Sequence, residues 1–433
     1  MKTALVWLRN DLRFEDQNSF FTACQEHERV VAYFSFEPKD YDKTMWGFTK
    51  TGKFRTHLLL ETLRSLQTEL ENKNISLIVE NRSAATGIPF WLDQLKATAL
   101  FFQEEWTFEE KMISDAVVNQ ISNDINVYSH YDQFLYHPED VSMEIQSIPK
   151  VFTEFRKKCE KFSNIRPCFS TPKVLNKSSL LSETPAMPVL EDFEFTPFTH
   201  HANSAFPFKG GMVSGLDHLQ NYFWNTKRLS YYKQTRNGLV GVGYSSKFSP
   251  WLANGSLSAR VIYWEVMRYE KEVKKNESTY WLIFELLWRD YFKYISLKHG
   301  NSIFHLGGIL KKEYTWNSKQ EDFLKWVEGE TAEPFVNANM IELKKTGFMS
   351  NRGRQNVASY FAKNMMMDWR MGAAYFERQL VDYDVHSNWG NWMYVAGVGN
   401  DPRDRKFNIK LQAERYDSNG KYQNLWLQNS LFE

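Results

Sequence analysis

Two kinds of hydrophobic pattern divide the chain. In the first part, short apolar runs typical of strands alternate with segments of helical periodicity. Strands are expected over residues 4–8, 30–36, 75–79, 99–102 and 125–128. Between the second and third, Phe54, Leu58 and Leu63 fall on one stripe of a helix expected over 53–70. This alternation predicts an α/β domain with a doubly wound, mostly parallel sheet over residues 1–130.

The pattern changes twice beyond residue 130. Residues 131–205 are polar and contain prolines such as Pro172 and Pro185, which indicates a long connector. Longer amphipathic segments follow, and they predict an all-α domain over residues 206–433. Its helices are expected over residues 258–272, 278–298, 320–328, 354–368 and 373–380.

Composition narrows the class of protein. The chain has 433 residues, 42% of them hydrophobic and 24% charged, as in a folded multi-domain protein. Its apolar runs are too short to span a membrane. Cys24, Cys159 and Cys168 are widely spaced, which excludes a disulfide framework and a cysteine-rich zinc site. The ten histidines form no spaced ligand motif, so no metal is predicted. We expect a soluble protein of the cytoplasm or an organelle.

Aromatic residues make up 16% of the chain, including 15 Trp. Large aromatic cores would explain this content, and so would stacking on bases or on a flat redox cofactor. Composition alone does not choose between these explanations.

Charge is unevenly distributed. Residues 1–200 carry 22 basic against 29 acidic residues, and residues 201–433 carry 31 against 23. Within 201–260 a single acid, Asp217, accompanies seven basic residues, which are Lys209, Lys227, Arg228, Lys233, Arg236, Lys247 and Arg260. This local positive field suits either nucleic acid or a phosphate-bearing cofactor. The first 130 residues contain neither GxGxxG nor GxxxxGK[ST], so ordinary dinucleotide or nucleoside triphosphate binding has no support there.

Segment 244–252 contains the strongest local signal for an anion site. Ser249 followed by Pro250 predicts a helix whose N-cap is Ser249. The hydroxyls of Ser245 and Ser246, together with Lys247, would then surround free N–H groups and suit a phosphate. An ordinary capped helix is the alternative.

A carboxylate stands in an aromatic helix further on. Glu285 shares a helical face with Trp281, Trp288 and Arg289. It could form an i,i+4 ion pair with Arg289. It could also be a buried acceptor that recognises N–H groups of a ligand. The segment leaves both interpretations open.

Two later segments combine charges with amides. Arg352 and Arg354 flank a glycine beside Asn351 and Gln355, which suits phosphate and carbonyl recognition, although a solvated helix start has the same composition. Segment 382–394 places acids, amides and aromatic residues together and is interpreted as a loop that carries a site.

Together these segments resemble the photolyase/cryptochrome flavoproteins, and within them the DASH-type cryptochromes. The resemblance begins at Val6-Trp-Leu-Arg9-Asn-Asp11-Leu-Arg13 and is dense from Tyr232 to about Tyr416. It rests on the order of long motifs, which are Tyr-Ser-Ser-Lys-Phe-Ser-Pro-Trp-Leu-Ala, Phe-Glu-Leu-Leu-Trp-Arg-Asp-Tyr-Phe, Thr-Gly-Phe-Met-Ser-Asn-Arg-Gly-Arg-Gln and Gly-Val-Gly-Asn-Asp-Pro-Arg.

The resemblance implies an N-terminal antenna domain and a helical domain that holds FAD in a folded shape. Cofactor-binding residues carried over from the family are Tyr232, Ser245, Ser246, Lys247, Ser249, Arg289, Arg354, Asp382, Asp384 and Asn388. Among them, Asn388 would face the reactive ring nitrogen of the flavin, and Asp382 would pair with Arg354 beside the ring. Methenyltetrahydrofolate is the implied antenna pigment, with Glu105 as its acidic contact.

The resemblance also implies a reaction, the light-driven repair of cyclobutane pyrimidine dimers by an electron from reduced FAD, as in a deoxyribodipyrimidine photolyase. The implied catalytic residues are Glu285, Asn351, Trp288 and Asn388. The tryptophan chain for photoreduction would be Trp392, Trp369 and Trp316. Residues implied to contact the nucleic acid are Gln355, Tyr394, Arg352, Lys227, Arg228, Arg403 and Arg405.

Departures from the repair enzymes shape the expected substrate. Phe348, Gln355 and Tyr394 stand where dimer photolyases commonly have Trp, Met and Trp. Smaller or more polar walls should hold a flipped dimer less tightly, which favours single-stranded DNA over duplex. RNA and looped duplex DNA are further candidates, and a monomer is expected. Asn337 replaces a usual Asp, which puts local helix anchoring in doubt. The alternative function is a blue-light photoreceptor with little repair, although the short tail after Asn400 favours repair.

Overall fold

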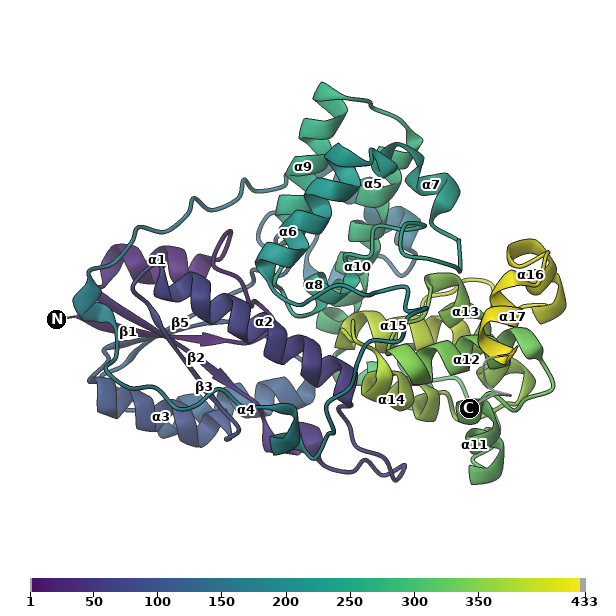
Figure 1. Ribbon diagram of the computed structural model, residues 1–433, viewed down its shortest axis with the longest axis horizontal. Coiled ribbons are helices and arrows are strands. Elements are labelled where there is room, and N and C mark those ends of the chain that lie inside the picture. Colours follow the sequence, from purple (N-terminus) through teal and green to yellow (C-terminus); the bar gives the residue numbers. More distant parts are fainter. Residues whose placement is uncertain (1, 429–433) are drawn as a thin grey trace.

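A computed structural model describes residues 2–428 (Figure 1). The sheet in this part of the chain has five parallel strands in the order β3-β2-β1-β4-β5. They are β1 (Thr3–Leu8), β2 (Arg29–Ser35), β3 (Ser76–Glu80), β4 (Ala99–Gln103) and β5 (Asn126–His130). The predicted parallel sheet is therefore confirmed, with strand ends displaced by one or two residues.

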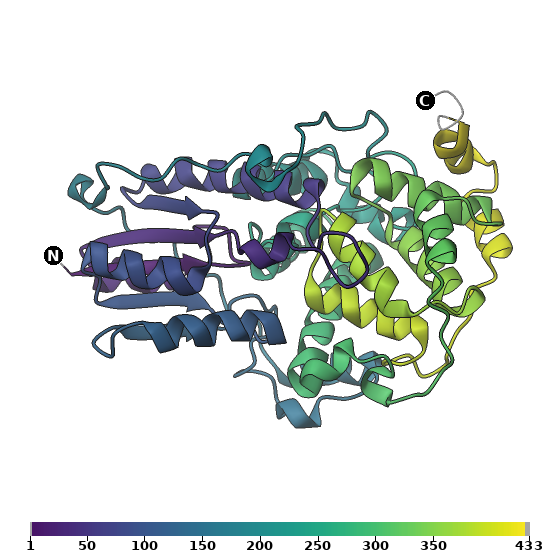
Figure 2. The ribbon, with the colours of Figure 1, turned by 90° about the horizontal axis from the view of Figure 1, so that it is seen from below.

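Helices cover both faces of the sheet, as Figure 2 shows from below. Val6 and Ala32 lie under α1 (Asn18–Glu26) and α2 (Lys53–Glu71), whereas Leu5 and Val31 lie under α3 (Ala84–Leu95) and α4 (Phe108–Gln120). Successive strand residues point to opposite faces, so a sheet covered on both sides needs continuous apolar runs. This requirement explains why the strands read as unbroken hydrophobic segments.

The polar stretch after β5 contains a helix that the sequence pattern did not predict. In α5 (Phe152–Phe162), Phe155 and Cys159 are buried against α10, and Phe155 contacts the rings of Tyr291 and Tyr294. The chain then returns along the sheet, where Leu175 donates its N–H to the carbonyl of Lys73 at 3.1 Å. The connector thus packs against both halves of the molecule.

The rest of the chain is helical, as predicted. Its helices are α6 (Met212–Gln220), α7 (Tyr232–Thr235), α8 (Ser249–Ala253), α9 (Ala259–Glu272), α10 (Glu277–His299), α11 (Gln320–Glu328), α12 (Pro334–Thr346), α13 (Asn351–Ser359), α14 (Trp369–Gln379), α15 (Val385–Ala396), α16 (Ile409–Tyr416) and α17 (Lys421–Leu427). No helix within residues 2–428 is long and apolar enough to cross a bilayer. Helix α13 begins three residues earlier than predicted and passes into a π-helical turn at 360–364.

The prediction of a loop over 382–394 is wrong, because most of this segment forms α15. The carboxylate of Asp384 caps the helix by accepting from the N–H of Ser387 at 2.7 Å. Its buried face includes His386 and Asn388 as well as Trp392, so polar side chains are part of the core. A buried helical face that contains amides has the composition of a loop, which is why the pattern was misread.

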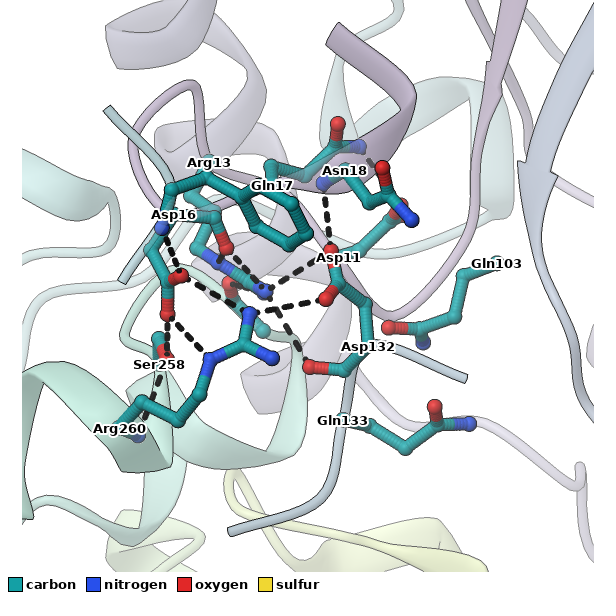
Figure 3. A network of polar contacts seen from close by, with 12 residues as sticks. Asp11, Arg13, Asp16, Gln17, Asn18, Gln103, Asp132, Gln133, Ser258 and Arg260 are labelled. Carbon is teal, nitrogen blue, oxygen red and sulfur yellow. Dashed lines mark hydrogen bonds and ion pairs between the residues drawn. The ribbon is translucent and has the colours of Figure 1, made fainter. Parts of the chain in front are cut away.

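A buried network of charges joins the two halves (Figure 3). Arg260, in the first turn of α9, donates to Asp16 at 2.8 and 3.0 Å and to Asp132 at 2.8 Å. Although burial acts in the opposite direction, Arg260 and Arg13 hold the pKa of Asp132 below its usual value. Arg260 was counted in the positive field of 201–260, and its charge is in fact neutralised by acids of the N-terminal half.

Candidate functional site

A cavity of about 580 Å³ opens between α7, α8, α10, α13 and α15. This volume lies in the range of small-molecule sites. Among the described residues, six basic and four acidic side chains line it. They are Arg236, Lys247, Arg289, Arg352, Arg354 and Arg405, with Glu285, Asp382, Asp384 and Asp401. The site therefore carries a formal excess of positive charge.

Lys247 is the most informative of these cations. Its side chain is 3% exposed, and its Nζ, which lies 3.1 Å from the centre of the Tyr244 ring, has no hydrogen-bond partner in the described part of the chain. Burial lowers the pKa of Lys247 well below its usual range. A buried ammonium group without a hydrogen-bond partner is costly, and an anionic ligand would reduce that cost. The phosphates of FAD fit this requirement.

The serine cluster lies beside this lysine, but the cap differs from the prediction. Ser245, Ser246 and Ser249 all line the cavity. The N-cap of α8 is Phe248, and Ser249 is already the first helical residue. Lys247 has a positive φ of 55°, which turns the chain two residues before the predicted cap and one residue before the observed one. The side chain of the observed cap makes no capping bond, and Ser249 lines the cavity instead of capping the helix.

Glu285 pairs with a different arginine from the one considered. A guanidinium nitrogen of Arg236, which follows α7, donates to Glu285. Arg289 instead donates to the carbonyls of Gln133 at 2.6 Å and Leu252 at 3.0 Å. Burial raises the pKa of Glu285, while Arg236 opposes that effect. The carboxyl group is thus held at the cavity wall with an enhanced affinity for protons.

Arg354 and Asp382 form the expected ion pair. One guanidinium nitrogen donates to both carboxylate oxygens at 2.9 Å, and Nε donates to the Met349 carbonyl at 2.9 Å. Both residues also line an adjoining cavity of about 100 Å³, together with Asn388 and Trp392. The amide of Asn388 donates to the Ala373 carbonyl at 3.0 Å. The pair and the amide thus border one space, where a flavin ring would find both.

A further cavity, of about 230 Å³, lies between the sheet and the helical domain. Glu105 is buried in its wall and accepts from the side-chain amide of Gln103 at 2.8 Å. Arg289 and Asp384 line both cavities and form a shared wall. Asp384 accepts from Lys293 at 3.2 Å, and although burial opposes it, this ammonium holds the pKa of Asp384 below its usual range.

The predicted electron-transfer tryptophans belong to a hydrophobic core formed by helices α11 to α17. Trp392 is buried, and its ring lies 5.1 Å from Phe376. Trp369 donates its indole N–H to the carbonyl of Leu306 at 2.9 Å. Trp316 is half-buried at the edge of the same core. Trp392 thus lines the adjoining cavity, Trp369 is fully buried and Trp316 is partly exposed.

The predicted nucleic-acid contacts separate into two groups. Arg352, Gln355, Tyr394 and Arg405 line the large cavity. The predicted cofactor-binding residue Tyr232 and the predicted catalytic residues Glu285, Trp288 and Asn351 line it too. Lys227, Arg228 and Arg403 are exposed and lie outside its lining. Arg352 donates to Gln355 at 2.8 Å, and the Trp288 ring meets Tyr394 edge to face at 6.0 Å. One group forms the walls of the cavity, and the other belongs to the surface.

Several site residues were not found from the sequence. Arg236 was counted only in the positive field, because nothing in the sequence signals a pair 49 positions apart with Glu285. Phe152 stacks on Trp288 at 3.7 Å although it belongs to the supposed connector. Asn337, the unusual replacement, accepts from the N–H of Thr331 and donates to its carbonyl, both at 2.9 Å. It therefore anchors the start of α12 locally.

Comparison with known proteins agrees with this geometry. Residues 4–173 match the DNA photolyase family, and residues 281–430 match the FAD binding domain of DNA photolyase. "Cryptochrome DASH" of Synechocystis is 46% identical over 98% of this chain and 87% of its own length, and "Cryptochrome DASH" of Danio rerio is 43% identical over 98% and 83%. The crystal structure of a Synechocystis cryptochrome superposes with a TM-score of 0.95 at 45% identity, covering 99% of this chain and 89% of that one.

Fold and site together define a flavoprotein with a photolyase-type FAD-binding domain. The chain belongs to the photolyase/cryptochrome family, in the branch of the DASH-type cryptochromes.

Proposed function

We propose that the protein repairs cyclobutane pyrimidine dimers under light, preferentially in single-stranded DNA. The observation that carries this proposal is the large cavity, which is lined both by the buried Lys247, whose Nζ has no hydrogen-bond partner in the described chain, and by Glu285 and Trp288. One side suits an anionic cofactor and the other a stacked, hydrogen-bonding base. In the overall reaction one electron passes to the dimer, its two ring bonds break, and the electron returns.

FAD, bound in its reduced form, supplies the light-absorbing electron donor. Lys247 and the three serines would hold its phosphates and ribityl chain. Arg354 would place positive charge beside the ring, while Asp382 fixes the orientation of that guanidinium through two bonds at 2.9 Å. Asn388 would meet the central ring. These groups are fixed before binding, so little reorganisation accompanies a change in charge.

Glu285 would act on the lesion. Because burial raises its pKa, the carboxyl group retains a proton more readily and can donate a hydrogen bond to a pyrimidine carbonyl as negative charge develops there. Arg236 holds the carboxyl group in place. Asn351 would add a second polar contact, and Trp288, stacked on Phe152, an apolar one.

The preference for a single strand follows from the cavity walls. A dimer must leave the base stack to reach Glu285, which costs a few kcal/mol in a duplex and less in a single strand. Gln355 and Tyr394 provide polar and edge-on walls, so they would stabilise an extruded dimer weakly. The exposed cations Lys227, Arg228 and Arg403 would contact the backbone together with Arg405 at the cavity.

Two auxiliary roles complete the proposal. Trp392, Trp369 and Trp316 would carry electrons to the flavin during photoreduction. The cavity between the domains would hold methenyltetrahydrofolate as an antenna, with Glu105 accepting hydrogen bonds from the pterin. The name of the relatives, cryptochrome, supports a second candidate function, a blue-light receptor in which photoreduction itself is the signal.

Variants of Glu285 test the proposal. Glu285→Ala should lower light-dependent repair of a dimer in single-stranded DNA by about 100-fold or more, with FAD content unchanged. Glu277→Gln is the matched control, because Glu277 lies on the same helix and pairs with Lys233 but is exposed. It should repair at the wild-type rate. Undiminished repair by Glu285→Ala would remove Glu285 from the mechanism, and no repair by a photoreducible wild-type protein would favour the receptor.

A further inference from the structure

A group of metal-ligating side chains lies apart from both cavities. His57 and Glu61 belong to α2, and His200 belongs to the segment that precedes α6. One ligand atom from each of the three residues lies within 4.8 Å of the others. None of the three residues lines any of the cavities described above. Sequence spacing gave no signal for this group, because His200 is far from the other two residues along the chain.

The spacing of the helical pair matches that of a zinc site. Residues four apart lie on the same face of a helix, and Nε2 of His57 is 3.4 Å from Oε1 of Glu61. Tetrahedral zinc binds nitrogen and oxygen ligands at about 2.0–2.2 Å, which places two ligands about 3.4 Å apart. The pair therefore has the separation that the metal requires.

Neighbouring contacts hold the pair and the segment in place. The second carboxylate oxygen of Glu61 accepts from the N–H of Gly210 at 2.9 Å. A Cβ on Gly210 would lie 2.4 Å from the carbonyl of Leu58, so only glycine permits this approach. The ring of Phe198 packs 5.1 Å from His57 and 5.9 Å from His200. Both ends of segment 198–210 thus dock on α2, and the exposed His200 needs only a small shift to complete the site.

The charges of neighbouring residues distinguish this group from a second group of possible metal ligands. Glu105, Glu110 and His386 also come within 4.8 Å, but the charges of Arg9 and Lys293 act on Glu105, and Lys293 acts on His386. Those cations oppose a metal ion. In the described chain, the charges that act on Glu61 and His200 come from within their own group. The nearby ammonium of Lys53 lies over the rings of Phe54 and Phe198.

We propose that this group is a zinc site. Nε2 of His57, Oε1 of Glu61 and an imidazole nitrogen of His200 bind one Zn²⁺, and water takes the fourth position. Imidazole nitrogen favours zinc and its transition-metal neighbours over Mg²⁺ and Ca²⁺, which prefer oxygen. Bound zinc would fasten segment 198–210 to α2, and this binding would stabilise the folded protein.

Equilibrium dialysis tests the site directly. FAD-containing protein without a polyhistidine tag is first freed of metal with EDTA, and bound Zn²⁺ is then measured by atomic absorption. We expect one Zn²⁺ per chain and a zinc-dependent rise in melting temperature, with no effect of Mg²⁺. His200→Ala and His57→Ala should each weaken binding by at least about tenfold, since loss of even a supporting partner costs about 10–100-fold.

The controls decide where zinc binds. His305→Ala removes an exposed histidine outside the group and should bind zinc like the wild type. Circular dichroism and FAD content show that each variant is folded. Equal zinc affinity in His57→Ala, His200→Ala and wild type would overturn the proposal. Loss of binding in Glu110→Gln alone would overturn it too, because the metal would then lie in the buried group.

Discussion

The cavity between the domains and the large cavity of the helical domain differ in how their charges are balanced. Seven acidic and five basic residues line the one between the domains, counted over residues 2–428, whereas four acidic and six basic residues line the helical one. In the first, Lys293 is paired with Asp384. In the second, Lys247 has no hydrogen-bond partner among the described residues. The helical cavity therefore has an excess of basic side chains and a buried cation that an anionic ligand could bind, whereas the cavity between the domains has an excess of acidic ones.

The wall between these two cavities separates the paired cations of one from the buried Lys247 of the other. Arg289 and Asp384 face both spaces, and backbone carbonyls and Lys293 hold them. Burial lowers the pKa of His386 well below its usual range, and Lys293 adds to that effect. The ammonium of Lys293 is thus paired with a carboxylate of the wall, while Lys247 in the helical cavity remains available to a ligand.

Breaking the ion pair of the helical cavity should have the largest effect. Asp382→Asn leaves the Arg354 guanidinium without its counterion and should lower the free energy of unfolding by about 3 kcal/mol. Denaturant titration measures this loss. Arg403→Gln, which changes an exposed arginine outside the cavity lining, should cost less than about 0.5 kcal/mol. Equal small losses in both variants would show that the pair contributes nothing.

A buried acid behind the cavity tests whether Lys247 is truly unpaired. Burial raises the pKa of Glu342 to about 7, where it accepts from the Tyr422 hydroxyl at 2.6 Å. An unfolded glutamate has a pKa near 4.5. Between these pH values the folded state holds a proton that the unfolded state has released. The stability that this proton contributes is full below about pH 4.5 and is lost as the pH rises through 7.

Glu342→Gln should consequently match the wild type at pH 4 and exceed its stability at pH 8 by about 3 kcal/mol. The difference between the two proteins isolates this group from other titrating acids, and chemical denaturation at both pH values measures it. Destabilisation of Glu342→Gln at pH 8 would mean that an ionised Glu342 pairs with Lys247, and the comparison of the cavities would fail.

Removing the unpaired cation itself should weaken cofactor binding. Lys247→Met keeps the volume of the side chain but deletes its charge, so FAD affinity should fall by about 10–100-fold, as expected for one charge-assisted hydrogen bond. Fluorescence of released FAD measures the dissociation constant. Lys410→Met, at an exposed position in α16, should bind FAD normally. Unchanged affinity in Lys247→Met would show that the phosphates lie elsewhere.

The smallest effect on FAD binding is expected from a change in the cavity between the domains. Glu105→Gln can still accept from Gln103, and it should change FAD affinity by less than about twofold. It should nevertheless reduce folate retention. Parallel measurement of flavin and folate absorbance checks both statements, and a large loss of FAD would show that the cavities are not independent.

The sequence allowed the fold to be predicted better than the pairing of charges. Continuous apolar strands and helical stripes depend on local periodicity, and Lys247 was singled out because its segment combines basic and hydroxyl groups. Partners that are distant in the chain leave no such pattern. The Arg236–Glu285 pair was therefore missed, and the buried amides of α15 were mistaken for a loop. The π-helical turn after α13 likewise depends on tertiary packing.

The most direct test of the account is repair of a single cyclobutane dimer by the flavin-reduced protein under blue light. The same dimer is placed in matched single-stranded and duplex oligonucleotides, with a dark reaction as the control. We predict light-dependent repair in the single strand and much slower repair in the duplex. Equal rates in both would contradict the role given to Gln355 and Tyr394, and no repair in either, with FAD bound and photoreducible, would contradict the central claim.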